Sequence, residues 1–320
     1  GPLAALALAL ATWRAERGDR SARSLVRLEG HGREESVVPG ADLSRTVGWF
    51  TTAFPVALDV TGIDIAEAMR GGPAAGRAIK AIKEQLLAIP DKGIGYGLLR
   101  YSNPETADAL AAAPATPQIG FNSLGRVDSG SSEQDSETYG WLPTGALGDA
   151  TAHQGEDMPA NATIDINTIV GDSVDGVRLR GSFTFPTGLL TRADVERLAE
   201  LWVSAAEAIS AFGRSGEAGG LTPSDVPLVS LSQHDIEKWE SRYGGVTDIW
   251  SLAPLQAGLL FHTMLAEQSL DVYTMQVVLN LAGAVDADRL RGAAQALLAR
   301  YESLRTAFVQ NDDGTSVQLV

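Results

Sequence analysis

The sequence predicts a mixed α/β fold, because stretches with helical periodicity alternate along the chain with short runs of strand-forming residues. Four stretches predict helices, at about 3–17, 63–87, 104–113 and 191–212. Two runs, 163–170 and 177–185, alternate between apolar and polar residues with the period of two that is typical of strands. With 320 residues, of which 44% are hydrophobic, the chain is long enough for one or two domains with a substantial core.

The first predicted elements are a buried helix and two strands. The Ala- and Leu-rich run Leu3–Ala11 has high helix propensity and is too short to cross a bilayer, so we interpret it as a core helix and not as a membrane span or signal peptide. A polar turn separates it from a strand predicted at 24–28. The aromatic, β-prone run 45–55, closed by Pro55, predicts a second and buried strand.

The next elements are predicted by periodicity and by proline. The pattern at 63–87 predicts one helix, which Pro90 ends. Five apolar residues share one face of it: Ala66, Ile79, Ile82, Leu86 and Leu87. A strand is predicted at 98–101, a helix at 104–113 and another strand at 119–124.

The rest of the chain predicts a loop, a hairpin, a helix and a linker. Residues 128–137, rich in Ser, Asp, Glu and Gly, predict a solvated loop. The alternating runs 163–170 and 177–185, separated by a polar turn with glycines, predict a β-hairpin. The helix that starts near 191 buries five residues: Val195, Leu198, Leu201, Trp202 and Ala205. From 213 to 247 glycine and proline recur and periodicity fades, which predicts a linker.

Composition excludes several classes of function. A formal net charge of -15 argues against a nucleic-acid partner, because phosphates bind to basic surfaces. The absence of cysteine excludes disulfides, thiolate nucleophiles and Cys-based metal sites, and it favours a cytoplasmic location. The four histidines are scattered without nearby ligands, so no metal site is expected.

Glu29 is the best candidate for proton transfer. It lies between apolar Leu28 and flexible Gly30, so we expect it to be desolvated, which favours the protonated carboxyl. A polar hairpin is the alternative interpretation of this short motif. The three glycines at 93, 95 and 97 do not predict a dinucleotide loop, because they follow Pro90 and lack the required spacing.

Four segments, in the same order, resemble signatures of the epimerization domains of nonribosomal peptide synthetases. They are EGHGREE at 29–35, RTVGWFTTAFPVALD at 45–59, PDKGIGYG at 90–97 and FNSLGR at 121–126. The resemblance covers roughly residues 3–240 and implies the C-terminal lobe of a condensation-superfamily domain. That fold resembles chloramphenicol acetyltransferase, with two α/β lobes around a tunnel for the phosphopantetheine arm of a carrier protein.

The resemblance implies three catalytic residues, which are Glu29, Asn122 and Ser123. In the family, the counterpart of Glu29 works with a histidine of an upstream HHxxxDG motif on the opposite face of the substrate. No two histidines are adjacent in these 320 residues, so we expect half of an active site and no activity from these residues alone. Ser123 stands where the family usually has tyrosine; serine keeps a hydroxyl but lacks the reach of the phenol.

The resemblance also implies residues of the substrate and pantetheine tunnel. They are His31, Arg33, Arg45, Trp49, Gly93, Gly95, Tyr96 and Phe121. The glycines would let a strand pass close to the arm, and a tight turn is the alternative. Arg45 and Arg126 could bind the phosphate of the arm, or they could be ordinary surface arginines.

Two further segments resemble the start of a condensation domain that accepts a D-configured donor. They are WSLAPLQAGLLFH at 250–262 and RYESLRTAF at 300–308. The expected organisation is therefore an epimerization lobe at 1–220, a closing segment and linker at 221–247, and a truncated condensation domain at 248–320. We expect no condensation activity, because this second domain stops before its own HHxxxDG motif.

The function that the resemblance implies is epimerization of an aminoacyl or peptidyl thioester from the L to the D form, feeding a downstream condensation domain. The implied partners are a peptidyl or acyl carrier protein and neighbouring synthetase domains, with no nucleic acid and no membrane. No bound cofactor is expected, since phosphopantetheine is the substrate tether of the carrier protein. The alternative is a non-catalytic platform that docks the carrier protein.

Overall fold

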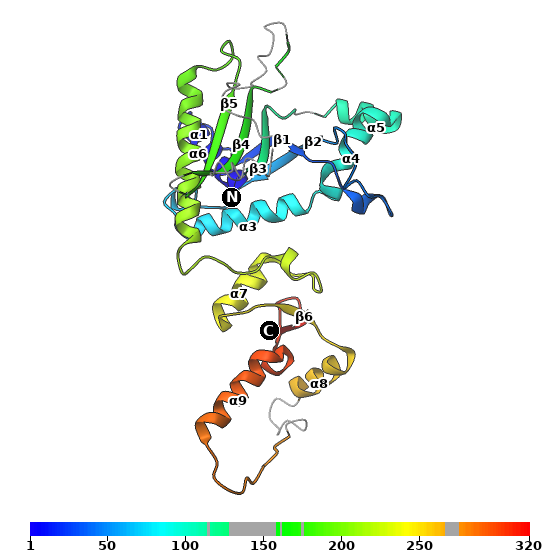
Figure 1. Cartoon of the computed structure of the whole chain (residues 1–320), viewed down its shortest axis with the longest axis vertical. Helices are drawn as coiled ribbons and strands as arrows, with labels where there is room; N and C mark the ends of the chain where they lie inside the picture. The colour runs from blue at the N-terminus through cyan, green and yellow to red at the C-terminus, as the bar shows by residue number, and fades with distance from the viewer. Residues whose placement is uncertain (114–115, 128–157, 161, 174–175, 266–274) are drawn as a thin grey trace, which may run out of the picture. The chain divides into compact units, whose positions relative to one another are not determined.

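The chain forms two compact units, Gly1–Ala218 and Gly219–Val320, each with its own hydrophobic core. The structure is a computed structural model (Figure 1) that describes residues 1–113, 116–127, 158–160, 162–173, 176–265 and 275–320. The loop predicted at 128–137 lies outside the described residues. No helix in these ranges combines the length and the apolar character needed to cross a bilayer.

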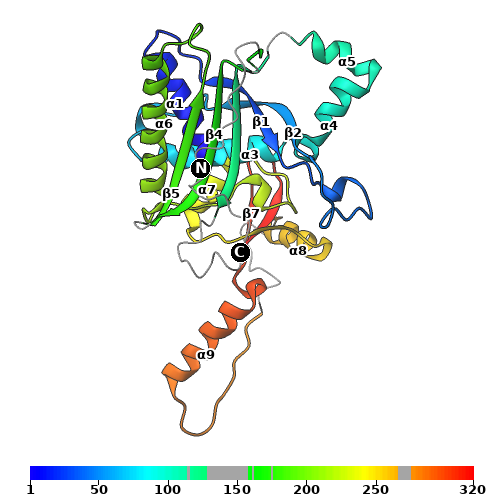
Figure 2. The same cartoon turned by 45° about the horizontal axis from the view of Figure 1, so that its top comes forward.

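A five-stranded mixed sheet forms the centre of the first unit, in the order β2-β1-β3-β4-β5 (Figure 2). β1 is parallel to β3 and β3 to β4, whereas β2 pairs with β1, and β5 with β4, in antiparallel fashion. The strands are β1 Arg23–Gly30, β2 Thr52–Asp59, β3 Ile119–Val127, β4 Ile164–Ser173 and β5 Gly176–Thr184. The mixed α/β class, the first strand and the hairpin are confirmed.

Two helices, α1 (Pro2–Ala15) and α6 (Arg192–Gly213), pack against each other on one side of the sheet (Figure 1). α1 also contacts α3, β1 and β2, and a helix with neighbours on several sides must be apolar nearly all round. The run Ala4–Ala11 is accordingly buried throughout, and all five residues predicted to face inward from α6 are buried. Both expectations are confirmed.

The packing of α6 on β5 identifies the covered face of the sheet. The Trp202 ring meets Phe183 edge-on at 6.0 Å between centroids. A Cβ added at Gly181 would lie 2.9 Å from the same indole. Because side chains alternate along a strand, Ser182 and Thr184 project from the opposite face.

The helix predicted at 63–87 is two helices, α2 (Ile65–Ala68) and α3 (Pro73–Leu87). The break falls at Gly71, whose φ is 76°, followed by Gly72 and then Pro73 as the first residue of α3. The apolar face predicted across that break is confirmed for Ile79, Ile82 and Leu86, which are buried or pack against the core, and is wrong for the other two residues. The buried residues of α3 are Ala74, Ala75, Ala78 and Ile82, whereas Ala66 and Leu87 are exposed.

The strand predicted at 98–101 is also wrong. A 3-10 turn, η2 (Pro90–Gly93), leads into a short helix, α4 (Ile94–Gly97), and a π-helical turn, η3 (Leu98–Ser102). A run of four residues is too short for periodicity to separate strand from helix. Helix α5 (Pro104–Ala111) follows as predicted.

The strand predicted at 45–55 begins later and continues past its proline. Residues 45–51 contain no strand, and β2 starts at Thr52 with Pro55 inside it. Pro55 is tolerated because β2 is an edge strand, where a missing N–H can face away from the ladder. The strand is half-buried, since Phe54, Val56 and Leu58 face the core.

The second unit contains a three-stranded antiparallel sheet in the order β6-β8-β7. Its elements are η5 Pro223–Asp225, α7 Gln233–Tyr243, β6 Ile249–Ser251, α8 Pro254–Leu265, α9 Ala287–Arg300, η6 Glu302–Arg305, β7 Ala307–Gln310 and β8 Ser316–Leu319. Ile236 and Trp239 of α7 are buried beside Ile249 and Val317 in its core. The expectation that periodicity fades as far as Thr247 is therefore wrong for α7.

Candidate functional site

The face of the sheet opposite α1 and α6 carries polar residues in two rows. Strand pairing aligns Arg27 of β1 with Gly120 of β3, Asp165 of β4 and Thr184 of β5. A second row contains Asn122, Asn167 and Ser182. Glu29, two residues after Arg27, lies on the same face of β1.

A cavity of about 210 Å³ lies on this polar face. It is lined by Arg27, Glu29, Gly120, Phe121, Asn122, Asp165, Ile166, Asn167 and Thr184. The structure thus brings together three predicted site residues, Glu29, Asn122 and Phe121, although Phe121 is itself buried in the core.

Sequence reasoning missed Arg27, Asp165 and Asn167. The signal that could have found them is the period-two pattern of their strands, where they occupy the polar positions between buried apolar residues. The alternation of β4 predicts the strand, and its polar positions share the face of the cavity.

An ion pair crosses the sheet inside this cavity. Arg27 Nη2 lies 3.1 Å from Asp165 Oδ1, with both side chains about one third exposed or less, at 27% and 33%. Gly120 lies between them, and a Cβ there would overlap the Asp165 carboxylate and lie 3.1 Å from Arg27 Nη2. In the next row Asn122 Nδ2 donates to Asn167 Oδ1 over 3.3 Å. The cavity therefore holds an oriented network of charges and amides.

Glu29 is exposed, and it pairs across the β1–β2 ladder with Ala53. The expectation that its neighbours desolvate it is wrong for the described part of the chain, because the polar face of β1 is open there. Within the same ranges no cation forms an ion pair with Glu29. Among the described residues, its carboxylate therefore lines the cavity without a charged partner.

Ser123 does not join Glu29 and Asn122. It is in register with Thr168, which is completely buried on the face that the helices cover. Residues that pair across adjacent strands share a face, so the Ser123 side chain leaves the sheet on the side opposite Asn122. The exposed Ser123 hydroxyl does not line the cavity.

A larger cavity of about 870 Å³ shares Arg27 with the first. Residues of β2, α4, η3 and α5 line it, including Phe54 and the predicted tunnel residue Tyr96. Gly93 is buried next to this cavity with φ 84°, and a Cβ there would overlap the Phe54 ring, so both conformation and space require glycine. A Cβ at Gly95 would meet nothing within 4 Å, so no close approach explains that glycine.

Arg33 supports a loop and is not free to bind a ligand. Its Nη1 donates to Leu43 O at 2.7 Å and its Nη2 to Thr46 O at 2.9 Å, while the guanidinium lies 4.4 Å from the centroid of the Phe50 ring. His31 Nδ1 accepts the Arg33 backbone N–H at 3.0 Å. These bonds fix the loop between β1 and β2.

The remaining predicted tunnel residues lie outside both cavities. His31 Nε2 faces Glu34 at 3.3 Å, and Lys92 Nζ reaches the same carboxylate at 2.8 Å. Arg45 is exposed, and Trp49 is 91% exposed. None of these three predicted residues lines the cavity that holds Glu29.

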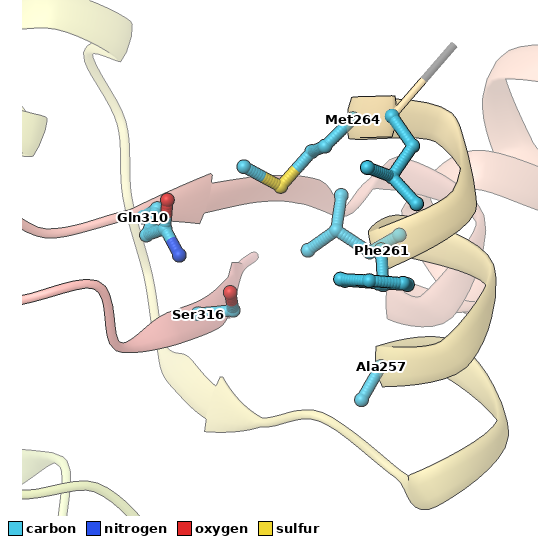
Figure 3. Close-up of a pocket in the computed structure, with 7 residues that line it drawn as sticks. Ala257, Phe261, Met264, Gln310 and Ser316 are labelled. Carbon is cyan, nitrogen blue, oxygen red and sulfur yellow. The ribbon is translucent and has the colours of Figure 1, made fainter.

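The second unit has a cavity of about 400 Å³ between α8 and two strands (Figure 3). Ala257, Phe261 and Met264 face Gln310 and Ser316 across it. None of the described residues that line it ionises, so they cannot transfer a proton at neutral pH. Among the described residues no group of three His, Asp or Glu side chains could hold a metal ion.

The Condensation domain family matches residues 3–212 and 246–320, so this chain belongs to that family. The chain is 38% identical to a linear gramicidin synthase of Brevibacillus parabrevis over 286 residues, which are 89% of this chain and 5% of that protein. It is 31% identical to bacitracin synthase 1 of Bacillus licheniformis over 285 residues, 88% of this chain and 5% of that protein. The chain thus spans about one twentieth of these relatives.

Among solved structures, the epimerization domain from the third module of tyrocidine synthetase B is 28% identical to this chain, with a TM-score of 0.49. The match covers 66% of this chain and 42% of that domain. Membership of the condensation-domain superfamily, with its mixed α/β fold, is confirmed by the family match.

Proposed function

We propose that this chain is part of a nonribosomal peptide synthetase and that its first unit supplies one side of an epimerization site. The observation that carries the proposal is the meeting of Glu29 and Asn122 in one polar cavity on the face of the sheet opposite α1 and α6. The order of the four signature segments and the peptide synthases among the relatives support it.

In this proposal Glu29 takes the α-proton of a carrier-bound thioester or returns it. A carboxylate without a cationic partner can change its protonation state during a reaction more easily than one held in an ion pair. The group on the other face of the α-carbon would be a histidine of an HHxxxDG motif, which is not among these residues.

Asn122 would stabilise the enolate-like intermediate. Its amide has two N–H donors, and the one shared with Asn167 orients the group in the cavity. A fixed donor beside a developing negative charge stabilises the transition state without reorganising.

The proposed substrate tether is the phosphopantetheine arm of a carrier protein, so the chain itself needs no bound cofactor. The larger cavity next to Arg27, with Phe54 and Tyr96 in its lining, would accommodate part of that arm. We propose that the second unit is the start of a condensation domain that accepts the D-configured product. We also propose that both units are located in the cytoplasm.

Glu29→Gln tests the proposal. In a polypeptide that joins these residues to a lobe carrying the HHxxxDG motif, the variant should slow exchange of the α-proton with deuterated solvent by roughly 10²- to 10⁴-fold. Glutamine keeps the shape but cannot carry a proton. Glu207→Gln, at an exposed position of α6 remote from the cavity lining, is the matched control, and His31→Ala should cost less than Glu29→Gln.

Near-normal exchange by Glu29→Gln would reject the catalytic proposal. Continued binding of the carrier protein to that variant would then favour the docking platform. Chiral analysis of the released amino acid distinguishes epimerization from mere hydrolysis of the thioester.

A further inference from the structure

Arg27 and Glu29 are neighbours on one face of β1. The two residues are two positions apart on β1 and project from the same face, about 6.7 Å apart along the strand. A guanidinium on a long stem can span such a separation. An ion pair with Arg27 would favour the charged form of Glu29 and make the carboxylate a weaker base.

Among the described residues, the Arg27 guanidinium pairs with Asp165 and not with Glu29. It crosses β3 and meets Asp165 on β4 at 3.1 Å, in a row that aligns Arg27, Gly120 and Asp165. A Cβ in the middle of this row would overlap the Asp165 carboxylate where it now lies, so glycine leaves room for the ion pair. The ion pair between Arg27 and Asp165 therefore involves three residues, one from each of β1, β3 and β4.

Two charged groups besides Glu29 are among the described residues that line the cavity. β1 contributes Arg27 and β4 contributes Asp165, whereas β3 contributes Gly120 and Asn122. β2 places the uncharged Ala53 opposite Glu29. Among these lining residues, the orientation of Arg27 therefore determines whether a positive charge lies next to Glu29.

We propose that Asp165 is a positioning residue of this site, which holds Arg27 across Gly120 and thereby keeps the guanidinium off the Glu29 carboxylate. The proposal rests on the proposed function where it concerns proton transfer. The electrostatic part concerns only this chain and can be measured without any reaction.

The first experiment follows the Glu29 carboxyl carbon by ¹³C NMR in this chain as the pH changes. Asp165→Ala removes the contact that draws Arg27 across β3, so the titration of Glu29 should move to lower pH. In a chain that already carries Arg27→Met, which keeps the stem and removes the charge, Asp165→Ala should move the titration much less, because only the lost Asp165 charge then acts on Glu29. An equal movement in both backgrounds would overturn the proposal. Asp165→Asn is the second variant if Asp165→Ala fails to fold, and a smaller movement in the same direction is expected because only the charge is lost.

The second experiment measures α-proton exchange in the polypeptide used for Glu29→Gln. Asp165→Ala should slow exchange by roughly threefold to tenfold, and it should have no further effect when Arg27→Met is already present. A role in folding alone predicts the same loss in both backgrounds, and that result would overturn the proposal. So would an unchanged Glu29 titration in Asp165→Ala.

The two failures are distinguishable. If Glu29→Gln stays active, the proposed function fails, while the NMR titration still reports whether Asp165 controls Arg27. If Glu29→Gln is inactive but the titration of Glu29 ignores Asp165, only the positioning role fails.

Discussion

Asn122 and Ser123 are neighbours in the chain, yet their side chains leave β3 on opposite faces of the sheet. Asn122 lines the polar cavity with Glu29, whereas Ser123 pairs with Thr168 on the side that the helices cover. The family's tyrosine at position 123 suggested a phenol that supports the intermediate. The geometry favours Asn122 for that task.

Ser123→Tyr should therefore leave α-proton exchange unchanged, because the new phenol would point away from Glu29. Asn122→Ala should slow exchange by about tenfold or more, since it removes an oriented donor from the cavity. Both variants are measured in the polypeptide used for Glu29→Gln, with melting temperature as the check on folding. A faster Ser123→Tyr enzyme of equal stability would contradict this assignment.

At the scale of elements, a charged cluster secures the end of β2 against the start of β1. Thr61 N–H donates to Asp59 Oδ1 at 2.9 Å, and Arg23 donates to Asp59 Oδ2 through Nε at 2.8 Å and Nη2 at 2.6 Å. The bonds from Thr61, followed by those from Arg23, lower the pKa of the Asp59 carboxyl from 3.8 to about 2. β1 and β2 carry Glu29 and the wall of the larger cavity, so this cluster supports the site from its far end.

Asp59→Asn should lower the free energy of unfolding at pH 7 by about 1 kcal/mol, a value reduced for solvent screening. Because the pKa of Asp59 is lower in the folded chain, the stabilisation is complete above about pH 4 and is lost as the pH falls toward 2. Urea unfolding of both chains between pH 7 and pH 2 measures the difference. A difference that stays constant over this range would contradict an ionic origin.

At the scale of the whole molecule, the two separate cores predict that each unit has its own free energy of unfolding. Leu198 is completely buried in the first core and Ile236 in the second. Each core consists of residues from its own unit, so a cavity in one removes no packing from the other.

Leu198→Ala should destabilise the first unit by about 2–5 kcal/mol and leave the second unit unchanged, and Ile236→Ala should do the reverse. Amide hydrogen exchange resolved by residue measures both units in one sample. Leu228→Ala, at a position 65% exposed, is the control for replacement of a large apolar side chain. Equal loss of protection in both units after Ile236→Ala would show that the units unfold together.

Much of the architecture follows from the sequence, because helix and strand periods report local burial. The pattern of α6 predicted its buried residues, and the alternation of β4 and β5 predicted their hairpin. The exceptions have local causes that periodicity does not resolve. Gly71 and Pro73 divide a continuous apolar pattern into two helices. The run at 98–101 is too short for its periodicity to distinguish a helix from a strand.

For the site, the motif around Glu29 and the segment containing Asn122 were recognisable in the sequence, and both contribute to one cavity. The face of the sheet on which the Ser123 side chain lies follows only from the register of β3 with β4. A shift of one residue in that register would move the side chain to the other face. The anchoring role of Arg33 required the path of its loop, because its partners are the carbonyl groups of Leu43 and Thr46.

The sequence by itself determined the family, the mixed α/β class and the position of the Glu29 carboxylate within a recognisable motif, because these depend on local patterns and short motifs. Only the tertiary structure decided which charges surround that carboxylate. Arg27 and Asp165 are 138 positions apart and meet across Gly120 because three strands pair in one register. Such a contact depends on how distant strands bury their apolar faces together, and no local pattern contains that information.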